Sequence, residues 1–267
     1  MYNAIKCWRR IRNRLAGKKV LLFLDFDGTL APLASTPEKA SLPAETRALL
    51  KKLLVLRRVT LAVISGRKLC DISRKVNLFG VFYAGNHGQQ VAGPRLNWHY
   101  KIPVTCRIRL KRLRVTLSRC LKTVEGILIE DKNGCVAVHY RNVKRGALKR
   151  IRGILRDVSS SFIKSGEIRM SKGKKVVEFS PAIQWDKGRV VLWLISRLAA
   201  KGADGSYIGI YVGDDYTDES VFGILRGKGI TVRVGGDRKT RAEYYLENTD
   251  ETYLFLKKIL RFAEKTG

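Results

Sequence analysis

The chain lacks several features that would place it in specialised classes of protein. Its longest apolar runs, such as 190–195, are far shorter than the roughly 20 residues that a transmembrane helix needs. The basic amino-terminal segment 1–18 is not followed by an apolar stretch with a small-residue cleavage site, so no secretory signal is predicted. We therefore expect a protein without a membrane span and with a cytoplasmic location.

Cysteine is scarce and scattered. The five thiols are odd in number and form no CxxC pair, so the sequence predicts neither a disulfide framework nor a zinc site. We expect free, reduced cysteines at Cys7, Cys70, Cys106, Cys120 and Cys135.

Acidic residues are also few. The 267 residues include 53 Lys and Arg against 23 Asp and Glu, which gives a formal net charge of +30. Half of this excess lies in residues 101–180, which hold 21 basic and 6 acidic side chains. The electrostatic field of this positive charge attracts anions of many kinds, so we expect non-specific, salt-sensitive binding of polyanions.

Strand-like and helix-like patterns alternate in both outer parts of the chain. Apolar runs at 20–24, 59–64 and 81–84 are separated by helical patterns at 43–56 and 68–76, and the alternation resumes over 187–263. This order predicts a Rossmann-like α/β core with a parallel sheet.

The basic amino-terminal segment contains an apolar stripe at helical spacing. Its members are Ile5, Trp8, Ile11 and Leu15. We expect this stripe to pack on the core, the alternative being contact with an acidic membrane.

The middle of the chain has a different pattern. Helical patterns at 107–122 and 143–158 accompany strand patterns at 125–130, 136–140 and 175–179, with a hairpin signal at Asn133-Gly134. We therefore predict a smaller α+β domain of αββαβ order over residues 101–180. It is inserted into a core formed by residues 1–100 and 181–267.

The stretch Asp25-Phe26-Asp27-Gly28-Thr29-Leu30 directly follows the apolar run 20–24. A buried strand that ends in two carboxylates delivers them to the carboxyl edge of the sheet, where open α/β sheets bind ligands. Residues i and i+2 of an extended segment point the same way, so Asp25 and Asp27 are expected to address one ligand. On its own, however, the motif is more typical of a strand followed by an Asx-Gly turn.

Three further elements of related chemistry follow. Ser65-Gly66-Arg67 ends an apolar run at the start of a helical pattern, where a hydroxyl and backbone N–H groups can hold an anion. Lys187 opens the helical pattern of 187–199. The acids after the run 207–212 are Asp214, Asp215 and Asp218, and carboxylates this close together suit a hard cation such as Mg²⁺. Each element alone is also typical of a helix cap or a solvated side chain, so the signal lies in their combination.

The order of these elements resembles that of the haloacid dehalogenase (HAD) superfamily of phosphatases. Within it, the chain from about residue 19 onward is similar to trehalose-6-phosphate phosphatases. The motifs that carry this similarity are Gly85-Asn86-His87-Gly88, Ile129-Glu130-Asp131-Lys132, Val138-His139-Tyr140-Arg141, the segment 173–181 and the acids of 213–219. Two positions depart from the family pattern: Asn86 stands where an acid is usual, and Asp186 where Asn is frequent.

The resemblance implies a HAD-like core, a cap domain at 101–180 and Mg²⁺-dependent hydrolysis of trehalose 6-phosphate to trehalose and phosphate. This reaction belongs to trehalose biosynthesis, beside a trehalose-6-phosphate synthase. Asp25 would be the nucleophile that becomes an aspartyl-phosphate, and Asp27 the general acid and base. Mg²⁺ would be held by Asp25, the backbone carbonyl of Asp27 and Asp214, with Asp215 and Asp218 in support.

The resemblance also implies two sets of substrate contacts. The phosphate-binding set is Gly28, Thr29, Ser65, Gly66, Arg67 and Lys187, of which Ser65 and Lys187 also serve catalysis. The sugar-binding set is His87, Glu130, Lys132, Arg141, Lys174 and Glu178.

The sequence is also consistent with two other functions. A HAD phosphatase that acts on another sugar phosphate or on a phosphoglycerate conjugate accords with the departures at Asn86 and Asp186. A basic polyanion-binding protein with a secondary phosphatase site accords with the charge. Against it, the sequence has no helix-turn-helix pattern, no interleaved aromatics and no zinc-ligand spacing.

Overall fold

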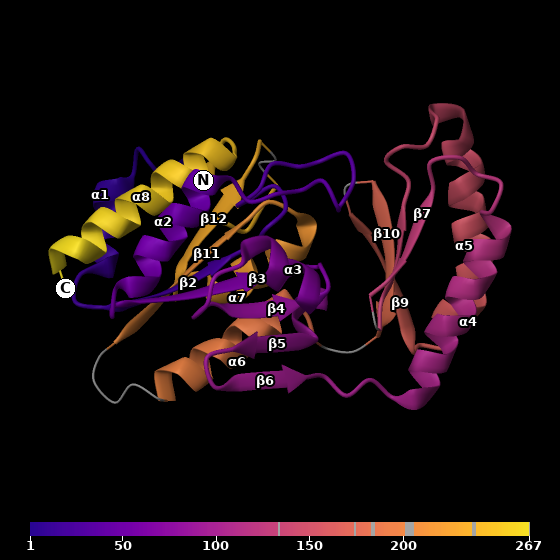
Figure 1. The fold of residues 1–267 in the computed structure, drawn as a ribbon, viewed down its shortest axis with the longest axis horizontal. Helices are drawn as coiled ribbons and strands as arrows, with labels where there is room; N and C mark the ends of the chain where they lie inside the picture. Colours follow the sequence, from indigo (N-terminus) through magenta and orange to yellow (C-terminus); the bar gives the residue numbers. More distant parts are fainter. Residues whose placement is uncertain (133, 174, 183–184, 201–205, 237–238, 267) are drawn as a thin grey trace. The chain divides into compact units, whose positions relative to one another are not determined.

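A computed structural model describes residues 1–132, 134–173, 175–182, 185–200, 206–236 and 239–266 (Figure 1). The chain forms two compact units. The core unit comprises Met1–His99 and Trp185–Gly267, and the second unit comprises Tyr100–Gln184.

The core unit contains a sheet that has nine strands among the described residues, in the order β1-β13-β12-β11-β2-β3-β4-β5-β6. In this order, each neighbouring pair of strands from β1 through β13, β12, β11, β2 and β3 to β4 is parallel. The pairs β4–β5 and β5–β6 are antiparallel. The strands span β1 Tyr2–Asn3, β2 Lys19–Leu24, β3 Val59–Ile64, β4 Phe82–Gly85, β5 Gln90–Gly93, β6 Leu96–His99, β11 Tyr207–Gly213, β12 Ile230–Val234 and β13 Tyr244–Leu246. The predicted α/β class with a parallel sheet is confirmed.

Helices cover both faces of this sheet because its central strands are apolar on both sides. Leu22 and Leu24 of β2 pack into one hydrophobic cluster with α1, α2, α3 and α8, whereas Leu21 and Phe23 pack into another with α6 and α7. The helices span α1 Trp8–Leu15, α2 Ala44–Val55, α3 Leu69–Val76, α6 Lys187–Ala200, α7 Glu219–Leu225 and α8 Thr249–Thr266. Two short 3₁₀ helices, η1 Asn86–Gly88 and η3 Tyr216–Asp218, lie beside the strand ends.

The amino-terminal segment packs on the core unit, as predicted. Ile11 and Leu15 of α1 have no exposed surface, and the rings of Trp8 and Phe255 meet edge to face at 6.0 Å. The strand β1 and the β5–β6 hairpin were not predicted, because two-residue and four-residue strands carry too little periodic signal.

The second unit is an antiparallel sheet covered on one face by two helices that lie side by side (Figure 1). The strand order is β7-β8-β10-β9, with β7 Leu128–Asp131, β8 Val136–His139, β9 Ile168–Gly173 and β10 Val176–Pro181. The helices are α4 Val104–Cys120 and α5 Leu148–Lys164, preceded by the 3₁₀ turn η2 Arg145–Ala147.

The αββαβ order predicted for this segment is wrong by one strand. The missed strand, β9, pairs with β10 from Ile168 to Gly173, and the order is αββαββ. As an edge strand β9 is largely exposed and polar, so its sequence shows no apolar alternation. The hairpin between β7 and β8 is present, although Asn133 of its predicted turn lies outside the described residues.

Among the described residues, no helix is both long enough and apolar enough to cross a membrane. The five cysteines are free. Burial raises the pKa of the Cys106 and Cys135 thiols in the second unit, which keeps them protonated and unreactive.

The packing of α1 leads to a stability prediction. Ile11→Ala should lower the free energy of unfolding by about 2 to 5 kcal/mol, because it opens a cavity in a fully buried cluster. Arg12→Ala, on the exposed side of the same helix, should change it by less than about 0.5 kcal/mol. Urea titration of both variants measures the difference, and equal values would show that α1 does not belong to the core.

Candidate active site

The predicted chemical elements meet at one edge of the core sheet. Strands β11, β2 and β3 are neighbours and run parallel, so their carboxyl ends lie together. Asp214, Asp25 and Ser65 are the first residues after these three strands. This edge is where an open α/β sheet binds its ligands.

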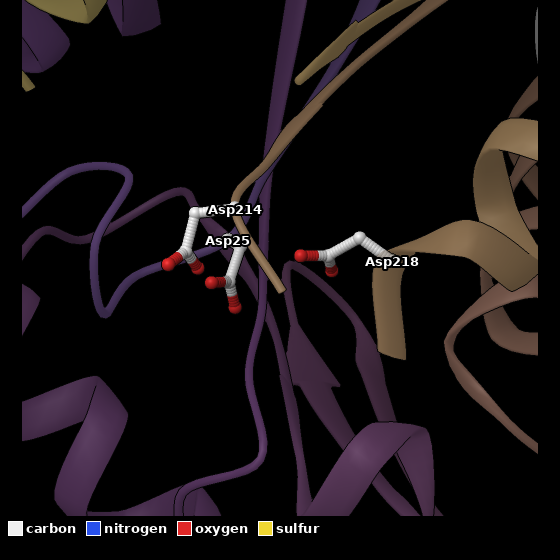
Figure 2. A group of neighbouring side chains, drawn as sticks. All are labelled: Asp25, Asp214 and Asp218. Carbon is white, nitrogen blue, oxygen red and sulfur yellow. The ribbon is translucent and has the colours of Figure 1, made fainter. Parts of the chain in front are cut away.

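Three carboxylates point toward one another at this edge (Figure 2). An oxygen from each of Asp25, Asp214 and Asp218 lies within 4.8 Å of the others, and all three residues are buried. Oxygen atoms so placed form a donor set for a hard divalent cation.

Lys187 supplies a positive charge to this cluster. Its Nζ donates hydrogen bonds of 2.8 Å to Oδ1 of Asp25 and of 2.8 Å to Oδ1 of Asp218, and the residue is only 2% exposed. Burial alone would lower the pKa of Lys187, but the two carboxylates more than compensate and hold it well above its usual value. The side chain is therefore a permanent ammonium group.

The two acids that flank Lys187 differ in their surroundings. Burial raises the pKa of Asp25 well above its usual value, and the charges of Asp218 and Asp214 add to the shift, against the opposing effect of Lys187. Burial acts on Asp218 in the same direction. There, however, the charge of Lys187 and hydrogen bonds from Lys187, Tyr211 and the Asp215 N–H prevail and lower the pKa. The ionised form of Asp218 is thus stabilised by its partners, whereas burial and the neighbouring acids oppose ionisation of Asp25.

Asp218 therefore orients its neighbours as well as adding charge. Its Oδ1 accepts the hydroxyl of Tyr211 at 2.6 Å, and its Oδ2 accepts the N–H of Asp215 at 2.8 Å. The side chain of Asp215 in turn accepts the N–H of Asp218, which completes a capping box at η3. Asp215 is outside the three-carboxylate cluster, while Asp218, expected only as support, is part of it.

Asp27 is bound to an arginine. Nε and Nη2 of Arg67 donate to the two carboxylate oxygens of Asp27, both at 2.7 Å, and Nη1 donates to Asp71 at 2.8 Å. The paired carboxylates raise the pKa of the Arg67 guanidinium further, even against burial. A two-point contact of this kind fixes both the position and the plane of the Asp27 carboxylate.

Two glycines allow the loops of the site to approach closely. Gly28 has a φ of +80°, and a Cβ there would collide with the Asp214 carboxylate. At Gly66 a Cβ would lie 2.7 Å from the His87 ring, so His87 packs against the Ser65 loop. The Ser65 hydroxyl accepts the N–H of Arg67 at 3.1 Å, while the buried Thr29 hydroxyl has no hydrogen-bond partner among the described residues.

The residues expected to read the sugar form a second polar group, within the second unit. Glu130 and Glu178 both pair with Ala137 of the intervening strand, so the two acids lie on the same face of the sheet. Nζ of Lys132 donates to Oε1 of Glu178 at 2.6 Å, and Nε2 of His139 is 3.3 Å from Oε2 of Glu130.

The charge of Lys132 is secured by its partner. Burial alone would lower the pKa of Lys132, but Glu178 raises it above its usual value. Of the other expected sugar contacts, Arg141 is exposed beyond the end of β8, and Lys174 lies outside the described residues.

The chain matches a known family over most of its length. The profile of the trehalose-phosphatase family matches residues 23–250. The chain belongs to this family. Its resemblance to HAD phosphatases of this type, first indicated by the order of the four motifs, is thereby confirmed.

Relatives of this trehalose-phosphatase family member are found in mycobacteria. It is 33% identical to a trehalose-phosphate phosphatase of Mycobacterium avium over 259 residues, which are 94% of this chain and 64% of that protein. It is 35% identical over 251 residues to an uncharacterized glycosyl hydrolase of Mycobacterium tuberculosis, covering 92% of this chain and 18% of that protein. The chain thus spans less than two thirds of the length of these relatives.

The fold of the family member is also that of a solved structure. The carboxyl-terminal domain of the trehalose-6-phosphate phosphatase of Candida albicans superposes with a TM-score of 0.81 at 18% identity, covering 99% of this chain and 98% of that chain. At this identity the comparison supports the fold, which is the HAD-like one expected.

Sequence reasoning missed several residues that organise this family member's site. Tyr211 was read as part of an apolar strand, because nothing in a strand pattern shows that its hydroxyl meets Asp218. Asp71 was also missed, although its i,i+4 spacing from Arg67 is a usable signal for an ion pair. His139 lies two residues beyond Ala137 on the face that holds Glu130, and strand alternation places it there.

Two further residues of note lie in the core unit just before helix α6. Trp185 donates from Nε1 to the carbonyl of Gly88 at 2.7 Å, and its ring lies 4.9 Å from that of Trp98. Asp186, one of the two departures from the family pattern, accepts the N–H of Arg189 at 2.9 Å. It therefore caps the helix that begins with Lys187, and Asp and Asn cap helices about equally well.

The pairing of Arg67 with Asp27 leads to a prediction about turnover. Arg67→Lys keeps the charge but loses the two-point contact, so hydrolysis of an aryl phosphate should slow about tenfold as Asp27 becomes less well oriented. Steady-state kinetics measure this change, with Arg74→Lys on the exposed side of α3 as the matched control. Unchanged turnover in Arg67→Lys would show that the pair does not position Asp27.

Proposed function

We propose that the chain is a Mg²⁺-dependent phosphatase that hydrolyses trehalose 6-phosphate to trehalose and phosphate through an aspartyl-phosphate on Asp25. The observation that carries this proposal is the buried pair of Asp25 and Lys187 beside two further carboxylates at the carboxyl edge of the sheet. Membership of the trehalose-phosphatase family supports the choice of substrate.

The donor set fits a magnesium ion. Asp25 and Asp214, with the backbone carbonyl of Asp27, would hold it, and Asp218 would support them by fixing Lys187 and the η3 turn. Burial, and to a lesser extent the charges of Asp218 and Asp214, raise the pKa of Asp25, and a bound cation would oppose this shift. When bound, Mg²⁺ would withdraw charge from the phosphate oxygens.

Asp25 performs the first step. A carboxylate oxygen of Asp25 forms a bond to phosphorus while the bond from phosphorus to the sugar oxygen breaks, and the departing oxygen takes a proton from Asp27. The ammonium of Lys187 neutralises charge that builds on the phosphoryl group. Trehalose leaves, and Asp27 remains as a carboxylate.

Asp27 performs the second step as a base. Its carboxylate takes a proton from a water molecule whose oxygen attacks phosphorus, and the bond from phosphorus to Asp25 breaks. Inorganic phosphate is released and both acids return to their first states. Arg67 serves this second step, because it fixes the plane of the Asp27 carboxylate that acts as the base.

The loops around Asp25 form the phosphate cradle of this proposal. The hydroxyl of Ser65 and the backbone around Gly28 and Gly66 would hold the phosphate, and the buried Thr29 hydroxyl has the capacity for a further bond. The N–H of Gly28 itself donates to the carbonyl of Ala31 at 2.7 Å, which closes the loop. Arg67 contributes positive charge behind Asp27.

The second unit is, in this proposal, the cap that reads the sugar. A disaccharide presents hydroxyls that both donate and accept, and the Glu130, Lys132 and Glu178 side chains offer both kinds of partner on one sheet face. Arg141 and Lys174 in this unit and His87 in the core unit complete the proposed set.

The setting of the enzyme is also proposed. Its substrate would come from a glycosyltransferase that makes trehalose 6-phosphate, and its free cysteines accord with a reducing cytoplasm. The net charge of +30 favours binding of polyanions at low salt.

The proposed chemistry predicts that Asp25→Asn abolishes turnover without loss of stability. The amide has no charged oxygen to attack phosphorus, so phosphate release from trehalose 6-phosphate should fall at least about 1,000-fold, as it should when Mg²⁺ is chelated. Metal-free Asp25→Asn should melt no lower than the metal-free native protein, because burial and neighbouring acids already oppose the charge on Asp25. Adding Mg²⁺ should raise the melting temperature of the native protein more than that of the variant.

Phosphate-release assays and thermal melts measure both effects. A panel of sugar phosphates in the same assay tests the substrate, because preference for a different sugar phosphate would retain the mechanism and replace trehalose 6-phosphate. Near-normal turnover in Asp25→Asn would refute the mechanism itself.

The sugar-reading role of the cap predicts a substrate-dependent loss. Glu178→Gln should lower kcat/KM for trehalose 6-phosphate at least about tenfold, since one buried charged hydrogen bond is worth roughly 1.5 to 3 kcal/mol. Hydrolysis of an aryl phosphate, which has no sugar hydroxyls, should change by less than about twofold.

The double variant Lys132→Met/Glu178→Gln distinguishes an effect on sugar recognition from an effect on stability. It removes the buried ammonium group that Glu178→Gln alone leaves without a charged partner. If the double variant recovers stability but not sugar selectivity, the pair reads the sugar. Equal losses on both substrates would contradict this role.

A further inference from the structure

The solvent-facing sides of α4 and α5 carry a dense positive charge that no acid balances. Nine exposed cations lie on these helices or, in the case of Lys122, two residues beyond the end of α4, and they have no ion pair among the described residues. They are Arg107, Lys111, Arg112, Arg119, Lys122, Lys149, Arg150, Arg152 and Lys164. We call this surface the basic helix face. The other basic residues of these helices, Arg109, Arg114 and Arg156, pair with Glu167, Asp131 and Asp157.

An aliphatic row lies within this face. Val104, Ile108 and Val115 of α4 are 60%, 48% and 49% exposed. At about 100° per residue these three positions fall within roughly 40° of one another, and they span about 16 Å along the helix. Leu113 and Leu117, which pack into the core of the second unit, lie nearly opposite. Helix α4 thus has two apolar sides, and its own sheet covers one of them.

The face is separate from the proposed sugar site. Val177 and Phe179 of β10 point toward α4 and α5, because they share a hydrophobic cluster with the helices. Glu178 between them points to the other side of the sheet. An occupant of the basic helix face would therefore leave the proposed sugar-reading residues uncovered.

We propose that the basic helix face binds the surface of an anionic lipid bilayer. The arginines and lysines would contact lipid phosphates, and the aliphatic row would enter the boundary between headgroups and acyl chains. The nine unbalanced cations supply the charge complementarity, and the aliphatic row supplies a contact that a hydrophilic polymer would not use.

Nucleic acid fits this face less well. Binding of single strands relies on aromatic side chains on which bases stack. In the described part of the second unit, the exposed large apolar side chains are Val104, Ile108, Val115, Leu128 and Met170, and none is aromatic. The face would attract nucleic acid by charge alone.

Vesicle sedimentation tests the proposal on the full chain. Vesicles of equal parts phosphatidylcholine and phosphatidylglycerol should pellet the protein at low salt, binding should weaken as salt is added, and vesicles of phosphatidylcholine alone should not pellet it. Binding to a DNA duplex, followed by fluorescence anisotropy, is measured in parallel.

Two pairs of matched variants locate the contact. Lys111→Gln/Arg112→Gln/Arg119→Gln should weaken vesicle binding on the order of 100-fold, at about fivefold for each charge near the surface. The equal charge loss Lys51→Gln/Lys52→Gln/Arg57→Gln, on the core unit, should weaken it less than about threefold through the long-range field alone. Ile108→Asn/Val115→Asn should weaken vesicle binding several-fold and leave DNA binding unchanged, whereas Val55→Asn/Leu254→Asn, also exposed but on the core unit, should change neither.

Aryl-phosphate hydrolysis and thermal melting check that each variant is folded, since none of these residues belongs to the proposed catalytic or sugar-binding sets. Three results would overturn the proposal. The first is no sedimentation with anionic vesicles at low salt, and the second is an equal loss of vesicle binding in the α4 and core-unit charge variants. The third is unchanged vesicle binding in Ile108→Asn/Val115→Asn. Tight DNA binding together with the third result would assign the face to nucleic acid instead.

Discussion

The structure of the site depends on one buried ammonium group. Lys187 Nζ lies between Asp25 and Asp218 at 2.8 Å from each, in a region where three carboxylates would otherwise repel one another. Removing Lys187 would cost several kcal/mol, because the buried carboxylates would then have neither water nor a counter-ion. Lys187 and Asp25 are 162 residues apart in the chain. The site therefore exists only when both parts of the core unit, on either side of the inserted second unit, have folded onto one sheet.

The same principle recurs at the second polar group. Lys132 is buried against Glu178, and its charge is retained for the reason that applies to Lys187: a carboxylate outweighs the effect of burial. In both places a buried lysine donates hydrogen bonds to acids from distant parts of the chain. Two preorganised charged groups, one suited to phosphate and one to hydroxyls, accord with a phosphorylated sugar as substrate.

Most of the positive charge has no part in this preorganisation. The nine unbalanced cations of the basic helix face make no ion pair among the described residues. The second unit does not need them to fold, because α4 and α5 are held to their sheet by apolar side chains such as Leu113 and Leu155. Surface charge of one sign opposes compaction through self-repulsion. A role outside the fold and outside catalysis is the simplest account of why it is concentrated there.

The sequence by itself determined the fold class and which residues meet in the candidate site. Alternating apolar runs and helical patterns indicate a parallel α/β sheet, because strands buried on both faces must be apolar throughout. The order of Asp25, Ser65, Lys187 and Asp214 indicates which side chains meet, since each follows a strand or opens a helix at the same edge.

Tertiary structure alone decided how these groups are connected. That Arg67 binds Asp27, that Tyr211 supports Asp218, and that Asp218 joins the carboxylate cluster while Asp215 caps η3 all depend on distances between loops from different strands. No local pattern encodes such distances. The edge strand β9 was missed for a related reason: its place in the sheet comes from hydrogen bonds to β10, and its own side chains are mostly in water. Local periodicity reports which face a residue occupies, whereas hydrogen bonds between distant segments form only when the whole sheet brings them together.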